Sequence, residues 1–338
     1  MALASLIKST EGNMRKRQVS LLASFLIAFC LALLPYVCEG GAKSKPMGQH
    51  TKISVESKPR LIVLPLQPQE TQGYDGIGLG VHFLLGNVVA PHTGLKEFWF
   101  GWRVKKIFPQ KENLIAYCHG EGPRLNLGKL GKEQDIRYWL WGSVKKQENK
   151  IQVSLVLTDT KEECDEWTTE LILDPADQLI GFRKGFLTWL DDCGLPFPDA
   201  QVPTALWPEK TTLRSLDLLG RDLKTYYLHA SWGDKGSFDP DLFDPAISAA
   251  PSSYLAHDLK GWVMYRNKDY KSAEKSFRSA IKINPDGLGA ISGLMWCAVY
   301  TNDVEKAYKW AMAKADIRGE SREAARTRVD RRIKKAFQ

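Results

Sequence analysis

Cysteine is scarce in this chain of 338 residues, and the cysteines are not spaced as the ligands of a metal site are. Two of the 6 cysteines lie within the apolar N-terminal run. The other four are Cys118, Cys164, Cys193 and Cys297. They form no C-x-x-C pair, which argues against a zinc site, and they are too few for a disulfide scaffold. A single disulfide among Cys118, Cys164 and Cys193 stays open.

Little net charge lies outside the two ends of the chain. The net charge is +8, but residues 39–314 account for only +1 of it. Residues 315–338 hold eight basic and four acidic side chains, and three consecutive basic residues occupy positions 15–17. A nucleic-acid-binding domain needs a basic face on its folded body. We therefore expect no nucleic-acid partner.

Patterns of catalytic and cofactor-binding residues are also missing. The 6 histidines are scattered, and no nucleophile–base pair, carboxylate pair or ligand cluster stands out. Gly76, Gly78 and Gly80 lack the third glycine of Gly-x-Gly-x-x-Gly, because Val81 and Phe83 occupy that position, so they predict close helix packing. We expect no enzymatic activity, no metal and no cofactor. A hydrolase would instead need a deep polar pocket holding an acid of strongly shifted pKa.

An apolar run near the N-terminus has the features of an export signal. Residues 19–38 carry no charged side chain and follow the basic residues 15–17. Residues 1–40 are therefore predicted to be a signal peptide or an uncleaved membrane anchor. Translation begins at Met1 or at Met14 in this interpretation.

The leader has one more interpretation, and the segment after it is predicted to be a linker. Lipidation of Cys38 is a third alternative for the leader, although Val37 departs from the small residue that a lipobox requires. Residues 41–58 lack an apolar period and predict a flexible linker. The folded part is then expected to be periplasmic or otherwise extracytoplasmic, with membrane association through its N-terminus.

In residues 59–200, apolar residues alternate with polar ones in several segments, which is the pattern typical of strands. A polar stretch at 145–150 predicts the turn of an antiparallel hairpin, and Asp174 begins a helix. Residues 77–90 fit a strand or a helix. The pattern predicts strands at 61–65, 136–144, 151–157 and 167–173.

Four segments in this region carry a family resemblance. They are LIVLP at 61–65, LGKLG at 127–131, YWLWGSV at 138–144 and LVLTD at 155–159. Their order resembles the N-terminal α/β domain of TolB and related envelope proteins over residues 59–195, with Trp167 at the place of a tryptophan in that family. The resemblance implies a mixed sheet with helices, and residues 86–115 fit it poorly.

A sequence repeat with a period of 34 occupies the C-terminal half. Phe243-x-x-Ala246-Ile247-x-x-x-Pro251 recurs as Phe277-x-x-Ala280-Ile281-x-x-x-Pro285. The central copy, 254–287, resembles the tetratricopeptide (TPR) family, and the copies before and after it are degenerate. The predicted repeat-packing residues are Gly261, Ala273, Phe277, Ala280 and Pro285. Residues 211–316 are therefore expected to form about three helical pairs.

In TPR-like stacks the first helix of each pair lines a concave groove. The resemblance implies two columns of groove residues that recur with the period of the repeat, and large aromatic residues with arginine are typical interface anchors. The alternative is that Trp262 and Trp296 are core residues. The predicted partner-binding residues are Leu228, Trp232, Trp262, Arg266, Trp296 and Tyr300.

The last segment, residues 317–338, has the pattern of a basic amphipathic helix. Its apolar residues Ala325, Val329, Ile333 and Phe337 recur at every fourth position, with Arg and Lys between them. This helix would cap the repeats. Its alternative role is contact with anionic lipid or an acidic partner.

These observations favour an α+β domain followed by an all-α repeat domain. We expect a non-enzymatic protein of the cell envelope that serves as an adaptor, scaffold or assembly factor. Its partners would be other envelope proteins or peptides. The alternative is an extracytoplasmic sensor or regulatory domain of a signalling system.

Overall fold

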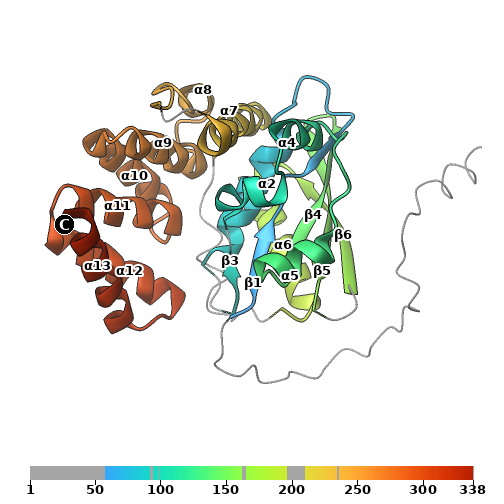
Figure 1. Ribbon diagram of the computed structural model, residues 1–338. Helices are drawn as coiled ribbons and strands as arrows, with labels where there is room; N and C mark the ends of the chain where they lie inside the picture. Colours follow the sequence, from blue (N-terminus) through green and yellow to red (C-terminus); the bar gives the residue numbers. More distant parts are fainter. Residues whose placement is uncertain are drawn as a thin grey trace, which may run out of the picture. The chain divides into compact units, whose positions relative to one another are not determined.

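A mixed sheet forms the N-terminal part of the molecule and helices form its C-terminal part (Figure 1). The computed structural model describes residues 58–91, 94–97, 99–161, 165–195, 210–233 and 236–337. All described elements belong to one compact unit, Thr51–Gln338. The predicted leader, nearly all of the predicted linker, and Cys164 lie outside the described residues.

The sheet has the strand order β3-β1-β4-β5-β6, and β2 pairs with β4. The parallel pairs are β1 with β3, β1 with β4 and β2 with β4, while β4, β5 and β6 are antiparallel. A two-residue turn, Glu148 and Asn149, joins β4 to β5, so the hairpin is tighter than the predicted turn at 145–150. The strands are β1 (Arg60–Val63), β2 (Gln67–Gln69), β3 (Lys96–Glu97), β4 (Tyr138–Gln147), β5 (Lys150–Asp159) and β6 (Asp165–Leu173).

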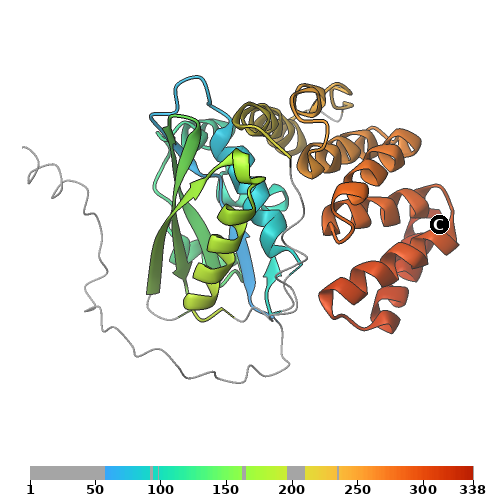
Figure 2. The ribbon, with the colours of Figure 1, turned by 180° about the vertical axis from the view of Figure 1, so that it is seen from behind.

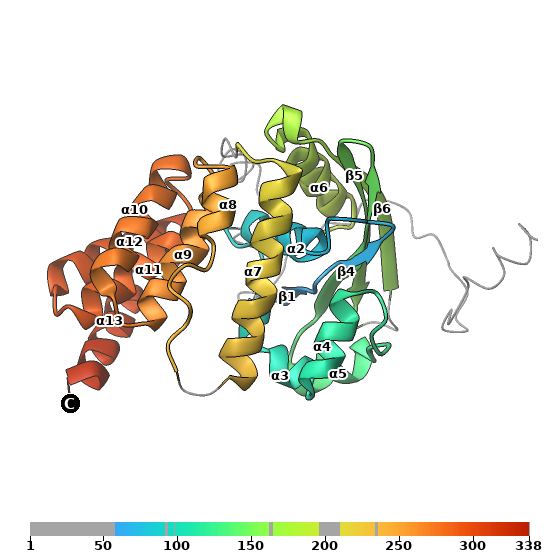
Figure 3. The same cartoon turned by 90° about the horizontal axis from the view of Figure 1, so that it is seen from above.

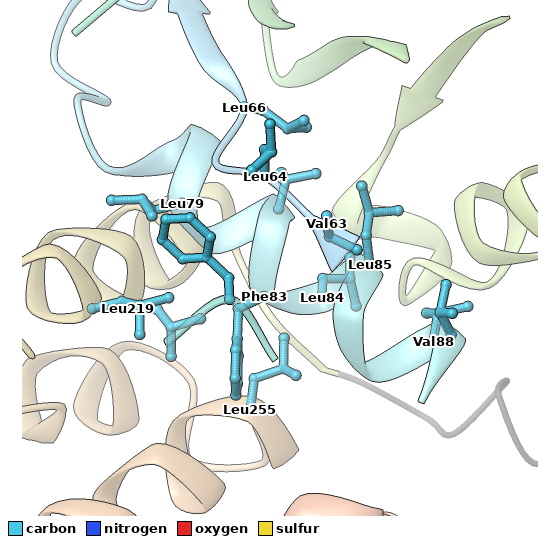
Figure 4. Close-up of a cluster of buried hydrophobic side chains, with 14 of the residues drawn as sticks. Val63, Leu64, Leu66, Leu79, Phe83, Leu84, Leu85, Val88, Leu219 and Leu255 are labelled. Atoms are coloured by element: carbon cyan, nitrogen blue, oxygen red, sulfur yellow. The ribbon is translucent and has the colours of Figure 1, made fainter. Parts of the chain in front are cut away.

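Helix α2 (Ile77–Val89) occupies the segment whose pattern fitted either a strand or a helix. It is buried along most of its length because strands contact one side of it and another helix contacts the other. Figure 4 shows its side chains Phe83 and Leu84 among those of neighbouring elements. Helix α6 packs against β6 (Figure 2). The remaining elements of this part are η1 (Phe100–Trp102), α3 (Val104–Ile107), α4 (Lys111–Cys118), α5 (Leu127–Gln134), η2 (Pro175–Asp177) and α6 (Ile180–Asp192).

Helix α7 (Leu213–Trp232) crosses α2 at a contact made by glycines (Figure 3). A Cβ on Gly220 would collide with the carbonyl oxygen of Gly76, and a Cβ on Gly80 would collide with that of Leu216. The buried Asp217 carboxylate accepts a hydrogen bond from the Gly76 N–H at 2.8 Å. The glycines that resembled a dinucleotide loop thus allow two helix backbones to touch.

The later helices recur with the same period as the sequence repeat. Helices α9 and α11 begin at Tyr254 and Leu288, and α10 and α12 begin at Tyr270 and Val304. Helices α7, α9 and α11 likewise end at residues 232, 266 and 300. The sequence period therefore corresponds to successive helical pairs. The helices of this part are α8 (Asp244–Ala249), α9 (Tyr254–Arg266), α10 (Tyr270–Ile283), α11 (Leu288–Tyr300), α12 (Val304–Arg318) and α13 (Arg322–Phe337).

Phe277 is fully buried between two of these helices. A Cβ on Gly261 of α9 or on Gly293 of α11 would collide with its ring, so the two glycines form the space that the ring fills. Ala273 and Ala280 are also fully buried on α10, and Pro285 lies exposed just beyond the end of this helix. Small residues thus let α9, α10 and α11 approach closely around one aromatic side chain.

Helix α13 packs on α11 and α12 through its apolar side. Ala325 and Val329 are buried there, whereas Phe337 at the helix end is 54% exposed. No helix among the described residues is long and apolar enough to cross a membrane. Cys118 and Cys193 are free thiols, so the disulfide left open by the sequence does not join these two residues.

Candidate functional site

A cavity of about 880 Å³ lies among the described residues. Its walls come from α2, β3 and η1 of the sheet part and from α9, α11, α12 and α13 of the helical part. The volume lies within the roughly 300–1,000 Å³ typical of ligand sites. Its basic residues are Lys96, Arg266, Lys314, Arg318, Arg328, Arg331, Arg332 and Lys335, and we call it the basic aromatic cavity. Its aromatic residues include Phe83, Trp99, Phe100, Trp102, Tyr226, Trp262, Tyr265 and Trp296.

One side of α9 supplies the centre of the wall. Asp258, Trp262 and Arg266 line the cavity, and their spacing of four places them on the same side of the helix. Helix α11 contributes Ser292 and Trp296, which occupy the positions of Asp258 and Trp262 in the next copy of the repeat. The repeat therefore places equivalent stripes of two helices side by side.

Several cations of the cavity have no acidic partner. Glu320 pairs with Arg318 and with Arg328. Within the described part of the chain, no ion pair forms at Arg266, Arg331 or Lys335. Guanidinium and ammonium groups without an ion pair on the wall of a cavity are binding groups for carboxylates and phosphates.

A guanidinium also covers one of the tryptophans. The Arg332 guanidinium carbon lies 5.1 Å from the centre of the Trp296 ring. A cation at this distance is attracted to the face of the indole. Trp296 is thereby held between α11 and α13, and the aromatic and basic parts of the lining form one continuous surface.

Two carboxyl groups of the cavity have raised pKa values. Asp258 is only 2% exposed, and its Oδ1 atom has no hydrogen-bond partner among the described residues. Burial raises the pKa of Asp258 to about 8, although Trp262 opposes the shift. Burial also raises the pKa of Glu97 to about 7, with Arg318 and Lys314 acting in the opposite direction. Asp258 is therefore mostly protonated at neutral pH and Glu97 is partly protonated, which leaves the cavity more positive than its composition suggests.

A serine and a lysine form a hydrogen bond on the same wall. The Lys314 ammonium donates to Ser292 Oγ at 2.9 Å, and the Ser292 hydroxyl donates to the Leu288 carbonyl oxygen at 2.6 Å. Burial and the nearby Arg318 lower the pKa of Lys314 to about 8. In this arrangement the lysine donates to the serine hydroxyl and the hydroxyl donates to the helix backbone, so Lys314 does not accept the serine proton as a general base would. The pair therefore favours holding a ligand over acyl transfer.

His82 is a buried residue of the cavity lining. Its Nε2 atom is 3.0 Å from the Tyr227 hydroxyl oxygen, and the Phe100 ring packs against it edge to face. Burial lowers the pKa of His82 to about 3, so the imidazole is neutral. Its surroundings indicate a packing role.

The predicted groove residues divide into two sets. Trp262, Arg266 and Trp296 line the cavity. Leu228 and Trp232 pack against the core from α7 and do not line it, and Tyr300, 43% exposed, also lies outside the lining. The ring of Tyr300 instead stacks on Tyr270 with centroids 5.5 Å apart.

Sequence reasoning missed the acids and most of the cations of this site. Asp258 lies one turn before Trp262, and Ser292 occupies the same repeat position, so the period of the repeat could have indicated both. No local pattern indicates that Glu97 of β3 faces Lys314 of α12, because the two lie far apart in the sequence. Groups of three or more His, Cys, Asp or Glu suited to a metal are absent from the described residues.

Comparisons of this chain with known protein families and with curated proteins gave no match.

Proposed function

We propose that this chain is a non-enzymatic adaptor or scaffold that holds a segment of another protein in the basic aromatic cavity. The observation that carries the proposal is the joint presence, on the walls of one cavity, of tryptophan rings and of arginine and lysine side chains that form no ion pair with any described residue. Tryptophan and arginine are enriched among residues that dominate binding energy at protein interfaces. The cavity is too small for a folded domain and suits a short segment.

The repeat and the leader support a cellular setting for this proposed activity. The helical pairs, which recur with the period of the sequence repeat, support a TPR-like stack, and the sheet part supports a TolB-like domain before it. The apolar run after three basic residues supports export to the cell envelope, with association to the membrane through the N-terminus. The partners would then be other envelope proteins or peptides, and nucleic acid is not among them.

Site-specific photo-crosslinking tests the proposal. Benzoylphenylalanine replaces Trp296 inside the cavity in one variant and Tyr300, one turn along the same helix, in the control. We expect the variant at 296 to form adducts with a discrete protein of the envelope fraction and the variant at 300 to form few. Adding Trp262→Ala and Arg266→Ala should remove the adducts while thermal unfolding stays cooperative. Equal adducts from both positions, or adducts that survive the double substitution, would contradict the proposal.

A hydrolase is the second candidate function. Two observations favour it: the Ser292–Lys314 hydrogen bond, and the raised pKa of Asp258 on the cavity wall, which is the kind of acid that a hydrolase was expected to need. A lysine of lowered pKa beside a serine hydroxyl is the nucleophile–base arrangement of some hydrolases. A fluorophosphonate probe separates the candidates. Labelling of the chain that is lost in Ser292→Ala would support hydrolysis, whereas no labelling of the folded protein supports the adaptor.

A further inference from the structure

The chemistry of the cavity walls restricts what the cavity can hold. Arg331 and Lys335 occupy the exposed side of α13, one turn apart, and both line the cavity without an ion pair to any described residue. Arg266 faces the same space from α9. These side chains come from two different helices, so an occupant of the cavity meets positive charge from more than one element. Charge complementarity therefore requires an anionic occupant.

Polar groups also lie between the apolar parts of the wall. Asn87, Asp258 and Ser292 line the cavity beside Trp262 and Trp296. Asn87 and Ser292 already make hydrogen bonds within the chain, whereas Oδ1 of Asp258 has no partner among the described residues. A lipid acyl chain would leave this carboxyl group without a hydrogen-bond partner, which is unfavourable. A peptide supplies backbone donors and acceptors for it, and one bulky side chain can cover the tryptophan rings. The wall therefore favours a peptide over a lipid.

We propose that the basic aromatic cavity binds an acidic peptide segment of a partner protein, with carboxylates at Arg266, Arg331 and Lys335 and one bulky apolar side chain against Trp262 and Trp296. This inference rests on the proposed function and specifies the chemistry of the partner. The chain's own residues 43–58 are unsuited as occupant, because Lys43, Lys45, Lys52 and Lys58 repel a basic cavity.

Isothermal titration of the full chain with synthetic peptides tests the inference. The acidic probe has Leu-Phe at its centre and two Glu on each side, with both ends blocked. Two matched probes change one feature each: Gln replaces every Glu in the first, and Gly-Gly replaces Leu-Phe in the second. We expect the acidic probe to bind at least about tenfold more tightly than either matched probe, and its affinity to fall as salt rises.

A charge-matched pair of variants locates the binding. Arg331→Glu with Lys335→Glu changes two residues of the cavity, and Lys334→Glu with Lys282→Glu makes the same change in net charge at exposed positions outside it. The cavity variant should weaken the acidic probe by at least about tenfold, whereas the control variant should bind it within about twofold of the unaltered chain. Circular dichroism melting checks that both variants fold.

The outcomes separate the inference from the proposed function. The inference of an acidic partner segment is wrong if the Gln probe binds as tightly as the acidic probe, or if the cavity variant and the control variant weaken binding of the acidic probe equally. Crosslinks from position 296 would in that case still support the proposed adaptor function. If vesicles of anionic phosphatidylglycerol bind through Arg331 and Lys335 and no peptide does, the occupant is a lipid and the inference is overturned. Absence of both peptide binding and cavity crosslinks would remove the proposed function as well.

Discussion

Burial sets the chemistry of single residues in this protein. Asp258 has a carboxyl oxygen without a partner among the described residues, and a Cβ added to the neighbouring Gly289 would collide with this carboxyl group. The glycine therefore leaves the space that the carboxyl occupies. A buried carboxyl without an opposite charge is more stable when it carries a proton, because desolvation penalises the ionised form.

Asp258→Asn should remove a pH dependence of the free energy of unfolding. The pKa of Asp258 is raised from 3.8 to about 8 in the folded chain. The folded state thus retains a proton that the unfolded chain has lost, so the contribution of Asp258 to the free energy of unfolding falls as pH rises from about 4 to about 8 and is constant above that. We expect Asp258→Asn to remove this fall and to stabilise the chain by on the order of 5 kcal/mol at pH 8 relative to pH 4.

Urea unfolding at several pH values measures this effect. Asp191→Asn, which changes an exposed carboxyl on α6, is the control and should leave the pH profile unchanged. If the profiles of Asp258→Asn and the unaltered chain run parallel from pH 4 to pH 9, the carboxyl of Asp258 is not held in its protonated form.

At the scale of elements, close backbone approach determines how helices meet. Helices α2 and α7 touch through Gly76, Gly80 and Gly220, and α9 and α11 meet around Phe277 through Gly261 and Gly293. Side chains larger than hydrogen at these positions would separate the helices. The two contacts differ, because the first joins backbone to backbone and the second encloses an aromatic ring.

Gly220→Ala should destabilise the molecule although alanine favours a helix. Its Cβ would collide with the Gly76 carbonyl oxygen, and neither helix backbone can give way without losing its packing. We expect a loss of roughly 1–3 kcal/mol in the free energy of unfolding, as for overpacked cores. Gly86→Ala is the matched control: its Cβ would meet only ordinary contact with Glu97, so it should stabilise by about 0.5–1 kcal/mol. If the two substitutions changed the free energy of unfolding equally, the close crossing of α2 and α7 would be contradicted.

Local sequence patterns predicted the elements better than they predicted the site. The hairpin of β4 and β5 and the repeated helical pairs follow from periodicity, since each depends on neighbours in the chain. The segment of α2 was ambiguous because it is buried on both sides, which removes the period of a helix. The cavity depends on contacts between β3, α9 and α13, and no local pattern encodes these.

At the scale of the whole molecule, the basic C-terminal segment carries much of the net charge. Arg328, Arg331, Arg332 and Lys335 of α13 all line the cavity, while residues 39–314 are nearly neutral. The sequence alone suggested a cap or a contact with lipid or an acidic partner for this helix. In the structure α13 packs on its neighbours through Ala325 and presents its cations to the cavity, so the segment has a packing side and a charged side.

Export of the chain is the remaining prediction at this scale, and it rests on residues 1–40, which lie outside the described residues. An alkaline phosphatase fusion made after residue 60 should be active in a bacterial host, because this enzyme folds only after export, and a fusion made at residue 14 should be inactive. Ile27→Arg with Phe29→Arg interrupts the apolar run and should abolish activity of the longer fusion. The mass of the exported chain then separates the three alternatives. A shortened chain indicates a cleaved signal, a full-length membrane-bound chain indicates an anchor, and an added mass that Cys38→Ser removes indicates lipidation. An inactive fusion after residue 60 would contradict export and, with it, the assignment of envelope partners.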